Sequence, residues 1–425
     1  MDGLKESLDA PGDDVAEVTL IGGSDGFGES IVVHIGKGQW LIVDCCINPI
    51  NGQCLPLEYL KSINVNIKEQ VRYIVCTHWH DDHIAGLSTL LSECGKDTTF
   101  ALSCAEDREK AVYELAQDFD YSGKSSVLKE LTKSFQIAAD NKIKIKRIEQ
   151  DKLIFKRGST QAFALSPSEV EVRKFETELV KAQSRFYHFI KDIKEIKQTS
   201  KELLDSAEEI EEEFFESIEN LLTAGIDVEQ QRVMPVEDLT KFKDAKKVKQ
   251  NNRSVAMLVS FGAHHIVLGA DLEVALIDTG WHSVLKCECM EDIHANLFKI
   301  PHHGSETGYM KDFLETFIKK DATSKMTSWI LGGNMLPKAD MLKKYYNHTK
   351  NLYITTTKLL RLKNTESNPS IRKLMNSKTE SIYEIIPQLG IIRSRLKINE
   401  ANDDWATSTF GSATLLKQED IKNLQ

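Results

Sequence analysis

One stretch of six residues constrains this chain more than any other feature. Residues 78–83 read His-Trp-His-Asp-Asp-His, which places three histidines and two aspartates within six positions. The stretch follows the short apolar run 71–76, which is typical of a buried strand, so its polar side chains come at a strand end. Imidazole and carboxylate groups at this density are typical of a metal site and not of core packing. The sequence therefore predicts a metal centre at the edge of a β-sheet.

The order of the side chains in this stretch suits two ions. His78 and His80 can reach one metal, because a turn after the strand brings both imidazoles to the same side. Asp82 and His83 follow at positions that suit a second metal nearby. Nitrogen and oxygen donors together suit zinc, and also manganese where oxygen ligands dominate. We expect two zinc or manganese ions per chain.

Two further clusters lie far downstream in the second half of the chain. Asp271 follows an apolar strand and a Gly-Ala turn, where a carboxylate can bridge two metals as binuclear hydrolases require. His302 and His303 follow another strand. One of these two imidazoles would complete the second metal site, and the other would face the substrate as a hydrogen-bond donor or general acid. The spacing leaves open which histidine has which role.

The net charge of −10 bears on what the protein binds. Proteins that hold nucleic acid by its backbone usually carry a basic stripe, because neutralising phosphates supplies most of their non-specific affinity. The overall balance gives no such stripe, although the Lys/Arg-rich stretches 142–157 and 240–253 are candidates for a local basic groove. We expect a small substrate such as a nucleotide, or DNA held with the help of a partner.

The chain shows no pattern of export or membrane insertion. It has no apolar run of about eighteen residues, and the acidic segment 1–14 lacks the regions of a secretory signal. Its eight cysteines lie at irregular positions without zinc-finger spacing, and they include Cys45-Cys46 and Cys287-x-Cys289. We expect a cytoplasmic protein with no membrane partner, whose reduced cysteines are buried as small hydrophobic side chains.

Strand patterns fill both halves of the chain. The expected strands are 15–20, a hairpin of 30–35 and 39–43, then 71–76, 254–261, 265–268, 329–331, 353–356 and 382–386. Residues 84–94 carry apolar side chains at helical spacing. A strand, a metal-rich loop and a helix thus follow one another between residues 71 and 94.

The middle of the chain has a different character. Residues 169–223 contain no Gly or Pro, are dense in charge and carry apolar side chains at helical spacing. This pattern predicts an amphipathic helical hairpin, broken near residues 198–200. Because the hairpin separates two β-rich halves, we interpret 169–249 as an insertion. It either packs on the core or offers a surface for a homodimer or another protein partner.

Taken together, the chemical clusters resemble a known family. In chain order they are Asp44 at a strand end, the HxHxDH segment 78–83, Gly269-Ala270-Asp271 and His302-His303-Gly304-Ser305. Their order and rough spacing are similar to those of the metallo-β-lactamase superfamily. The similarity extends to the hydrolase domain of the ComEC/Rec2 DNA-uptake proteins in stand-alone form, through segments 251–254 and 300–305. It covers about residues 15–168 and 250–360.

The resemblance implies the fold. It is an α/β fold of four layers, the αββα metallo-β-lactamase sandwich, here with a long helical-hairpin insertion. We expect 15–168 to form the first half of this domain and 250–395 the second half. The insertion at 169–249 lies between them, and 396–425 forms a polar C-terminal tail.

The resemblance also implies a ligand set. His78 and His80 would bind metal one, and Asp82 and His83 would bind metal two. Asp271 would bridge the two metals. The remaining ligand of metal two would be His303.

Other residues would act on the substrate or on the ligands. Asp82 and His302 are the candidate catalytic residues, with His302 contacting a phosphate or carbonyl oxygen. Asp44 would orient the histidine loop without binding metal itself. Asn252 and Ser305 would lie near the substrate.

Two positions depart from the family pattern. Ser166 stands where the superfamily has a third histidine for metal one, so we expect that metal to be the weaker of the two. Met335-Leu336-Pro337 stands where the DNA-uptake group has Gly-His-Pro, which removes one expected substrate contact.

The resemblance implies hydrolysis of a phosphodiester, by a nuclease or phosphodiesterase that acts alone or within a defence or repair assembly. The same site would also support hydrolysis of an ester, lactone or thioester. A third alternative is a partner-binding subunit with a structural or vestigial metal site. An intact ligand set argues against the last alternative, because a vestigial site is expected to have lost several ligands.

Overall fold

The structure, a computed structural model, describes residues 9–23, 27–103, 125–174, 250–331, 334–356, 388–400 and 403–422. The predicted hairpin insertion lies outside these residues, apart from 169–174, and so does the expected strand 382–386. Of the two predicted halves of the domain, the structure describes 15–23, 27–103 and 125–168 in the first and 250–331, 334–356 and 388–395 in the second.

The first sheet has eight strands in the order β17-β16-β1-β2-β3-β4-β5-β6. They are β1 (Val15–Gly23), β2 (Glu29–His34), β3 (Trp40–Val43), β4 (Val71–Cys76), β5 (Thr99–Ser103), β6 (Lys144–Ile148), β16 (Leu389–Lys397) and β17 (Ala406–Gly411). The expected hairpin is confirmed, since β2 and β3 pair antiparallel. The strands from β3 to β6 run parallel.

The second sheet also has eight strands, in the order β18-β15-β12-β11-β10-β9-β8-β7. They are β7 (Leu153–Arg157), β8 (Thr160–Ala164), β9 (Met257–Phe261), β10 (His264–Leu268), β11 (Ala295–Lys299), β12 (Ile318–Met326), β15 (Leu352–Ile354) and β18 (Thr414–Leu415). Strands β10, β11, β12 and β15 run parallel. Their carboxyl ends therefore meet at one edge, where β13 (Trp329–Leu331) and β14 (Asn334–Leu336) form a separate hairpin.

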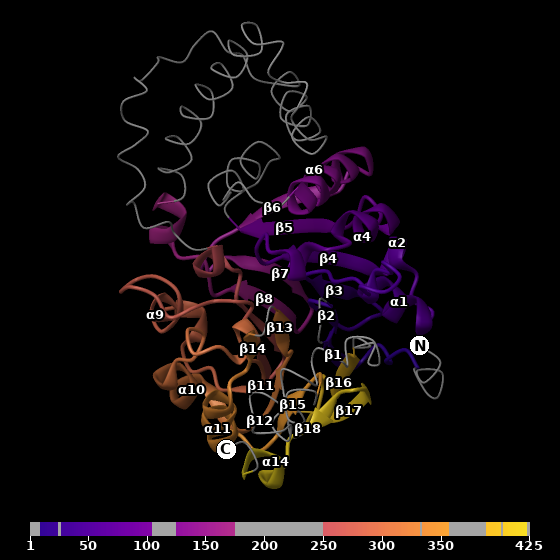
Figure 1. Cartoon of the computed structure of the whole chain (residues 1–425). Coiled ribbons are helices and arrows are strands. Elements are labelled where there is room, and N and C mark those ends of the chain that lie inside the picture. The colour runs from indigo at the N-terminus through magenta and orange to yellow at the C-terminus, as the bar shows by residue number, and fades with distance from the viewer. Residues whose placement is uncertain are drawn as a thin grey trace, which may run out of the picture.

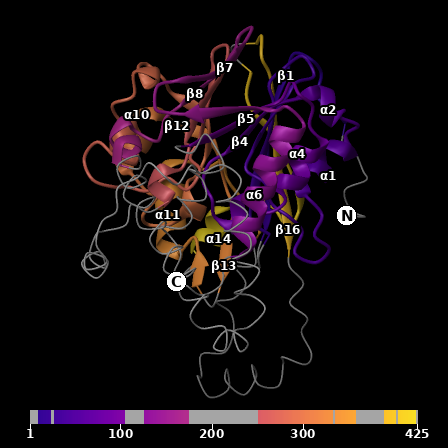
Figure 2. The ribbon, with the colours of Figure 1, turned by 90° about the horizontal axis from the view of Figure 1, so that it is seen from above.

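Helices cover the outer face of each sheet (Figures 1 and 2). On the first sheet these are α1 (Leu55–Ser62), α2 (Ile67–Gln70), α4 (Leu87–Glu93) and α6 (Ser125–Asp140), and on the second α9 (Trp281–Val284), α10 (Lys311–Phe317), α11 (Ala339–His348) and α14 (Gln418–Lys422). Three apolar clusters fill the spaces between the layers: one under each helical layer and one between the sheets. A helix–sheet–sheet–helix sandwich follows, as predicted.

Two buried lysines connect the sheets. Lys299 on β11 and Lys325 on β12 are neighbours in register, and both are almost fully buried. The ammonium group of Lys299 donates to Glu29 on β2, and that of Lys325 donates to the carbonyls of Val18 and Ile392 in the first sheet, at 2.7 and 3.2 Å. Burial lowers the pKa of Lys325 well below its usual value. These contacts fix how one sheet lies on the other.

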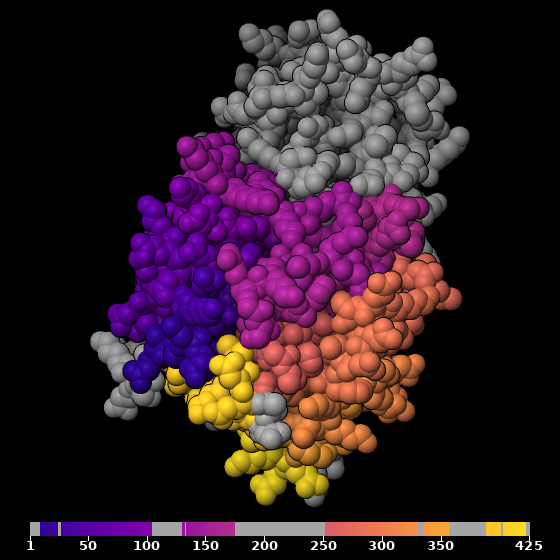
Figure 3. Space-filling view, turned by 180° about the vertical axis from the view of Figure 1, so that it is seen from behind, coloured from indigo at the N-terminus to yellow at the C-terminus, as the bar shows by residue number. Residues whose placement is uncertain are grey.

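The structure differs from the sequence expectation in one helix, in the C-terminal tail and in strands that the sequence did not predict, such as β5, β8 and β12. The expected helix 84–94 begins only at Leu87, as α4, because Ala85 (ψ 120°) and Gly86 (φ 85°) are not helical and separate it from α3 (Asp81–Ile84). The predicted polar tail supplies β17 to the first sheet and β18 to the second. Seen from behind, this yellow segment lies between the indigo and orange parts of the surface (Figure 3).

The described cysteines are free, and six of these seven are buried as expected, whereas Cys289 is half-buried. Among the helices that the structure describes, none is long and apolar enough to cross a membrane.

Candidate metal centre

The predicted site residues lie on loops that follow strands of both sheets. His78, His80, Asp82 and His83 come after β4, and Asp271 comes after β10. His302 and His303 follow β11 in the short helix η7 (His302–Gly304). Because β10 and β11 are parallel neighbours, their carboxyl ends bring Asp271 and the histidine pair to the same edge. Stacking of the sheets then brings this edge against the end of β4.

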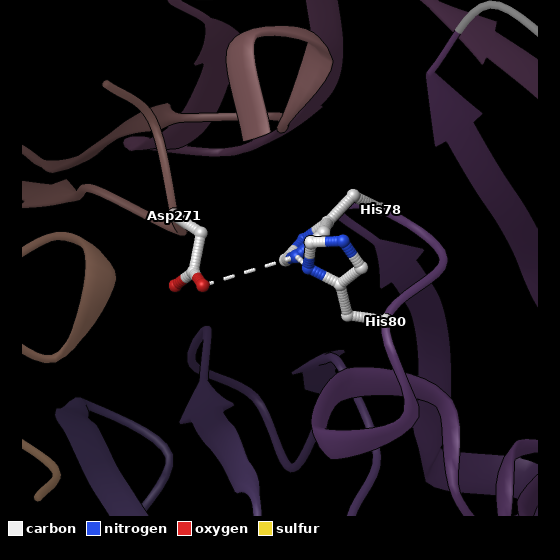
Figure 4. Close-up of side chains that lie close together, drawn as sticks. All are labelled: His78, His80 and Asp271. Carbon is white, nitrogen blue, oxygen red and sulfur yellow. Dashed lines mark hydrogen bonds and ion pairs between the residues drawn. The ribbon is translucent and has the colours of Figure 1, made fainter. Parts of the chain in front are cut away.

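The first group of possible ligands is His78, His80 and Asp271. Nε2 of His78 lies 2.9 Å from Nδ1 of His80 and 3.9 Å from Oδ2 of Asp271. Figure 4 shows both imidazoles on one side of this gap and the carboxylate on the other. This is the arrangement predicted for metal one.

The second group is Asp82, His83 and His303. Oδ2 of Asp82 lies 3.2 Å from Nε2 of His303 and 3.8 Å from Nε2 of His83. Asp82 and His303 are 221 positions apart in the chain. The structure thus brings together the residues predicted for metal two.

Asp271 joins the two groups through a single oxygen. Its Oδ2 atom lies 3.4 Å from Nε2 of His83 and 3.9 Å from Nε2 of both His78 and His303. Histidines of both groups therefore face the same carboxylate oxygen. A bridging ligand of a binuclear centre needs this position.

Asp44 restrains His83 directly and His78 through Thr77, in both cases at the ring nitrogen Nδ1. Its Oδ2 atom accepts from Nδ1 of His83 at 2.7 Å and from the hydroxyl of Thr77 at 2.7 Å. Since the single hydroxyl proton of Thr77 goes to Asp44, its oxygen accepts from Nδ1 of His78, 2.9 Å away. Both rings then present Nε2 to the centre. The orienting role predicted for Asp44 requires contacts of this kind.

A matching arrangement holds His303. The hydroxyl of Thr327 donates to Glu29, and its oxygen lies 2.9 Å from Nδ1 of His303. Glu29 also accepts from the ammonium of Lys299. A carboxylate–threonine–histidine chain therefore orients the ring on each side of the centre.

Glu29 is a residue of the site that the sequence did not predict. Its carboxylate also lies within reach of His83 and Asp271 as a possible ligand group. An acidic residue at the start of a strand, two positions before the apolar run Ile31–Val33, is the signal that could have found it.

His302 lies at the entrance of the centre and not within it. Its side chain is 20% exposed, and its Nδ1 atom lies 3.2 Å from the Glu273 carboxylate. Burial lowers the pKa of His302, but the hydrogen bond with Glu273 and the charge of Asp271 raise it above the usual value. A protonated imidazole in this position can donate to a substrate oxygen.

Asn251 lies close to His302. Its amide nitrogen donates to Glu273 at 3.2 Å and lies 3.4 Å from Nε2 of His302. The predicted substrate neighbours are arranged differently: Oδ1 of Asn252 is buried without a hydrogen-bond partner among the described residues. The hydroxyl of Ser305 lies 3.0 Å from that of Thr307 and accepts from Gly308 N, so it stabilises the turn after η7.

The donor set fits metal ions. Nε2 of His83 and Oδ1 of Asp271 are buried, and within the described parts of the chain neither has a hydrogen-bond partner. Burial and the neighbouring His83 and His80 lower the pKa of His78 well below its usual value, so this imidazole is a neutral ligand. Burial opposes ionisation of Asp271, but His83 and His303 lower its pKa well below the usual range. A cation bound to His83 would satisfy its orphaned Nε2 atom.

Burial alone would lower the pKa of His83, but Asp271, Asp82 and Asp44 raise it well above its usual value. Such a concentration of acids around one buried ring is favourable only with positive charge among them. A proton on His83 supplies that charge, and a metal ion would replace the proton.

The backbone at the site is held in unusual conformations. Asp44, Ala270, His302 and His303 have φ values of 58°, 46°, 46° and 51°. Each such conformation costs roughly 1–3 kcal/mol and persists only where surrounding contacts impose it. Gly28 also has a positive φ, and a Cβ there would collide with the backbone of Asp82.

Ser166 is not placed to act as a ligand. Its buried hydroxyl donates to Ser254 O at 2.5 Å and accepts from Ala256 N at 2.9 Å. His264 and His265 bond to Glu400 O and to the Ser260 hydroxyl, on β-strands of the second sheet. Among the described residues, metal one therefore has His78, His80 and Asp271 as its possible ligands.

Comparison with known families agrees with this site. Residues 23–98 match the Metallo-beta-lactamase superfamily. The matched metallo-β-lactamase segment includes Asp44 and the whole stretch 78–83, while Asp271 and the histidine pair lie beyond it. No curated protein matches the chain.

One solved structure with some likeness is described as hydrolase AbOPH in beta lactamase superfamily. It has 17% identity and a TM-score of 0.25, and the likeness covers 37% of this chain and 71% of that chain. A likeness of this size carries no argument, so the metallo-β-lactamase fold rests on the family match and on the two stacked sheets.

Proposed function

We propose that this chain is a binuclear metal-dependent hydrolase that cleaves a phosphodiester in DNA or in a nucleotide. The observation that carries the proposal is the position of Asp271, whose Oδ2 atom faces His78 on one side and His83 and His303 on the other. A carboxylate shared by two histidine groups is what a two-metal hydrolase requires.

The chain supplies the ligands and holds them in place. His78, His80 and Asp271 would hold one ion, and Asp82, His83 and His303 the other. When bound, such ions supply Lewis acidity that activates water and stabilises negative charge on the phosphoryl oxygens.

Protonation of the leaving group falls to His302. It lies at the entrance, and Glu273 holds its Nδ1 atom, so Nε2, which lies 3.4 Å from the amide nitrogen of Asn251, would be the atom that contacts a substrate oxygen. General acids of this kind contribute about 10²–10⁴-fold to the rate. Asn251, beside Nε2 of His302, can donate to a second substrate oxygen.

The choice of a phosphodiester rests on the resemblance of segments 251–254 and 300–305 to those of the ComEC/Rec2 hydrolase domain. Hydrolysis of an ester, lactone or thioester by the same residues is the alternative. A vestigial site in a partner-binding subunit is disfavoured, because both ligand groups are complete enough for an ion.

A cleavage panel tests the proposal. Purified protein loaded with zinc or manganese should hydrolyse bis-p-nitrophenyl phosphate, linear DNA or a cyclic nucleotide, and His80→Ala should lack this activity. Hydrolysis of a carboxyl ester or thioester alone would replace the phosphodiester proposal with its alternative. A wild-type protein that binds no metal after reconstitution would contradict both the phosphodiester proposal and its alternative.

A further inference from the structure

A second cluster of metal-binding side chains lies away from the histidine centre. Asp151 is in the turn between β6 and β7, Cys287 precedes the short helix η6 (Glu288–Met290), and Cys289 lies within it. One oxygen of Asp151 and the two sulfur atoms all lie within 4.8 Å of one another. Asp151 and Cys287 are separated by more than a hundred positions, so the fold alone brings them together.

Hydrogen bonds hold the three side chains in this arrangement. Oδ1 of Asp151 accepts from the backbone N–H of Cys289 at 3.0 Å. The side-chain amide of Gln150 donates to the sulfur of Cys287 at 2.9 Å. The thiolate is the form of cysteine that binds metals. Asp151 and Cys289 are each half-buried, so an ion can reach the cluster from solvent.

The donor types select a different class of ion from the histidine centre. Thiolates favour zinc and other soft ions over magnesium, calcium or manganese. In a tetrahedral zinc site, Zn–S bonds of about 2.3 Å place two sulfur atoms about 3.8 Å apart. The two sulfur atoms, which lie within 4.8 Å of each other, therefore need to approach by at most about 1 Å. Water can take the fourth position.

We propose that Asp151, Cys287 and Cys289 form a separate binding site for a thiophilic divalent cation such as zinc. The ion would connect the β6–β7 turn to the segment that precedes β11. That turn also holds the loop after β8, because Gln150 N donates to Pro167 O and Asp151 N donates to Ala164 O. This loop carries Ser166, whose hydroxyl fixes the backbone at Ser254. The proposal does not depend on the reaction at the histidine centre.

Metal binding at Asp151, Cys287 and Cys289 can be tested with cobalt. The full-length protein is loaded with Co²⁺ under reducing conditions, and the sulfur-to-cobalt charge-transfer absorption is measured, which histidine and carboxylate ligands do not give. Wild type and His80→Ala should both show it, and Cys289→Ser should lose it. Cys94→Ser, which changes a buried cysteine outside both clusters, should retain it.

Asp151→Asn gives a second variant that keeps the fold. Asparagine preserves the oxygen that accepts from Cys289 N and tolerates the φ of 60° at this position. It should weaken Co²⁺ binding, followed by the same absorption, at least about tenfold. The assignment is overturned if wild type shows no charge-transfer absorption with excess Co²⁺, or if Cys289→Ser retains it. Equal loss in Cys94→Ser and Cys289→Ser would also overturn it.

Discussion

Nδ1 of His83 and Oδ2 of Asp44 lie 2.7 Å apart, in a buried contact between the loops that follow β4 and β3. The same carboxylate accepts from the N–H and the hydroxyl of Thr77, so it restrains both His83 and His78. One acid thus positions a ligand of each proposed metal. Replacing Asp44 should therefore weaken the binding of both metals.

Asp44→Asn should therefore weaken metal binding by about 10–100-fold, the usual effect of removing a partner that orients a ligand. Asparagine has nearly the same size as aspartate, but its side chain has one acceptor oxygen instead of two. Zinc titration with a competing chelator measures the change. Asp312→Asn, on the exposed first turn of α10, is the control and should bind like wild type. Unchanged affinity in Asp44→Asn would show that the histidine loop is held without it.

Thr327→Val tests the other carboxylate–threonine–histidine chain. Valine has nearly the same shape but cannot connect Glu29 to Nδ1 of His303. Affinity for one metal should fall about tenfold, while the other is retained, because His78 and His80 are held separately. Two-site titration measures this. Thr316→Val, an exposed threonine on α10, serves as the control. Equal weakening of both metals would contradict the division into two groups.

His302→Ala and His303→Ala should fail differently. His302 lies at the entrance, so its loss should lower the rate about 10²–10⁴-fold with metal content retained. His303 faces Asp82 and Asp271, so its loss should lower metal content as well as rate. Metal analysis beside the rate of cleavage of bis-p-nitrophenyl phosphate separates the two. Metal loss from His302→Ala with His303→Ala unaffected would reverse the assignment.

Lys325 should make stability depend on pH. Its folded-state pKa is lowered by burial, so the unfolded chain binds more protons between that value and the usual lysine pKa. The free energy of unfolding should therefore rise with pH in this window, by at most about 1.4 kcal/mol per pH unit, and the contribution is lost as pH falls through the folded pKa.

Urea unfolding at pH 7 and pH 9 measures this slope in wild type and in Lys325→Met, where it should be shallower. Lys320→Met, on the exposed part of the same strand, should keep the wild-type slope. Identical slopes in all three proteins would mean that Lys325 does not titrate differently in the folded state.

Most of the ligand set could be predicted from the sequence, because it is local. His78, His80, Asp82 and His83 occupy one turn after one strand, and a run of polar ligands directly after an apolar strand shows in the order of residues alone. Two strands were predictable for the same reason: β4 and β13 have the predicted bounds, since nearly all of their residues are apolar. The break of the 84–94 helix at Gly86 depends on a backbone conformation that the apolar spacing does not reveal.

The sequence by itself determined that this chain carries a two-sheet fold with candidate metal ligands at strand ends. Only the tertiary structure decided which distant groups complete and orient them. Glu29, Thr327 and Glu273 become part of the site because the sheets stack and because parallel strands end at one edge. Asp151 meets Cys287 for a similar reason. These pairings depend on contacts between segments far apart in the chain, and no local pattern of residues encodes such a distance.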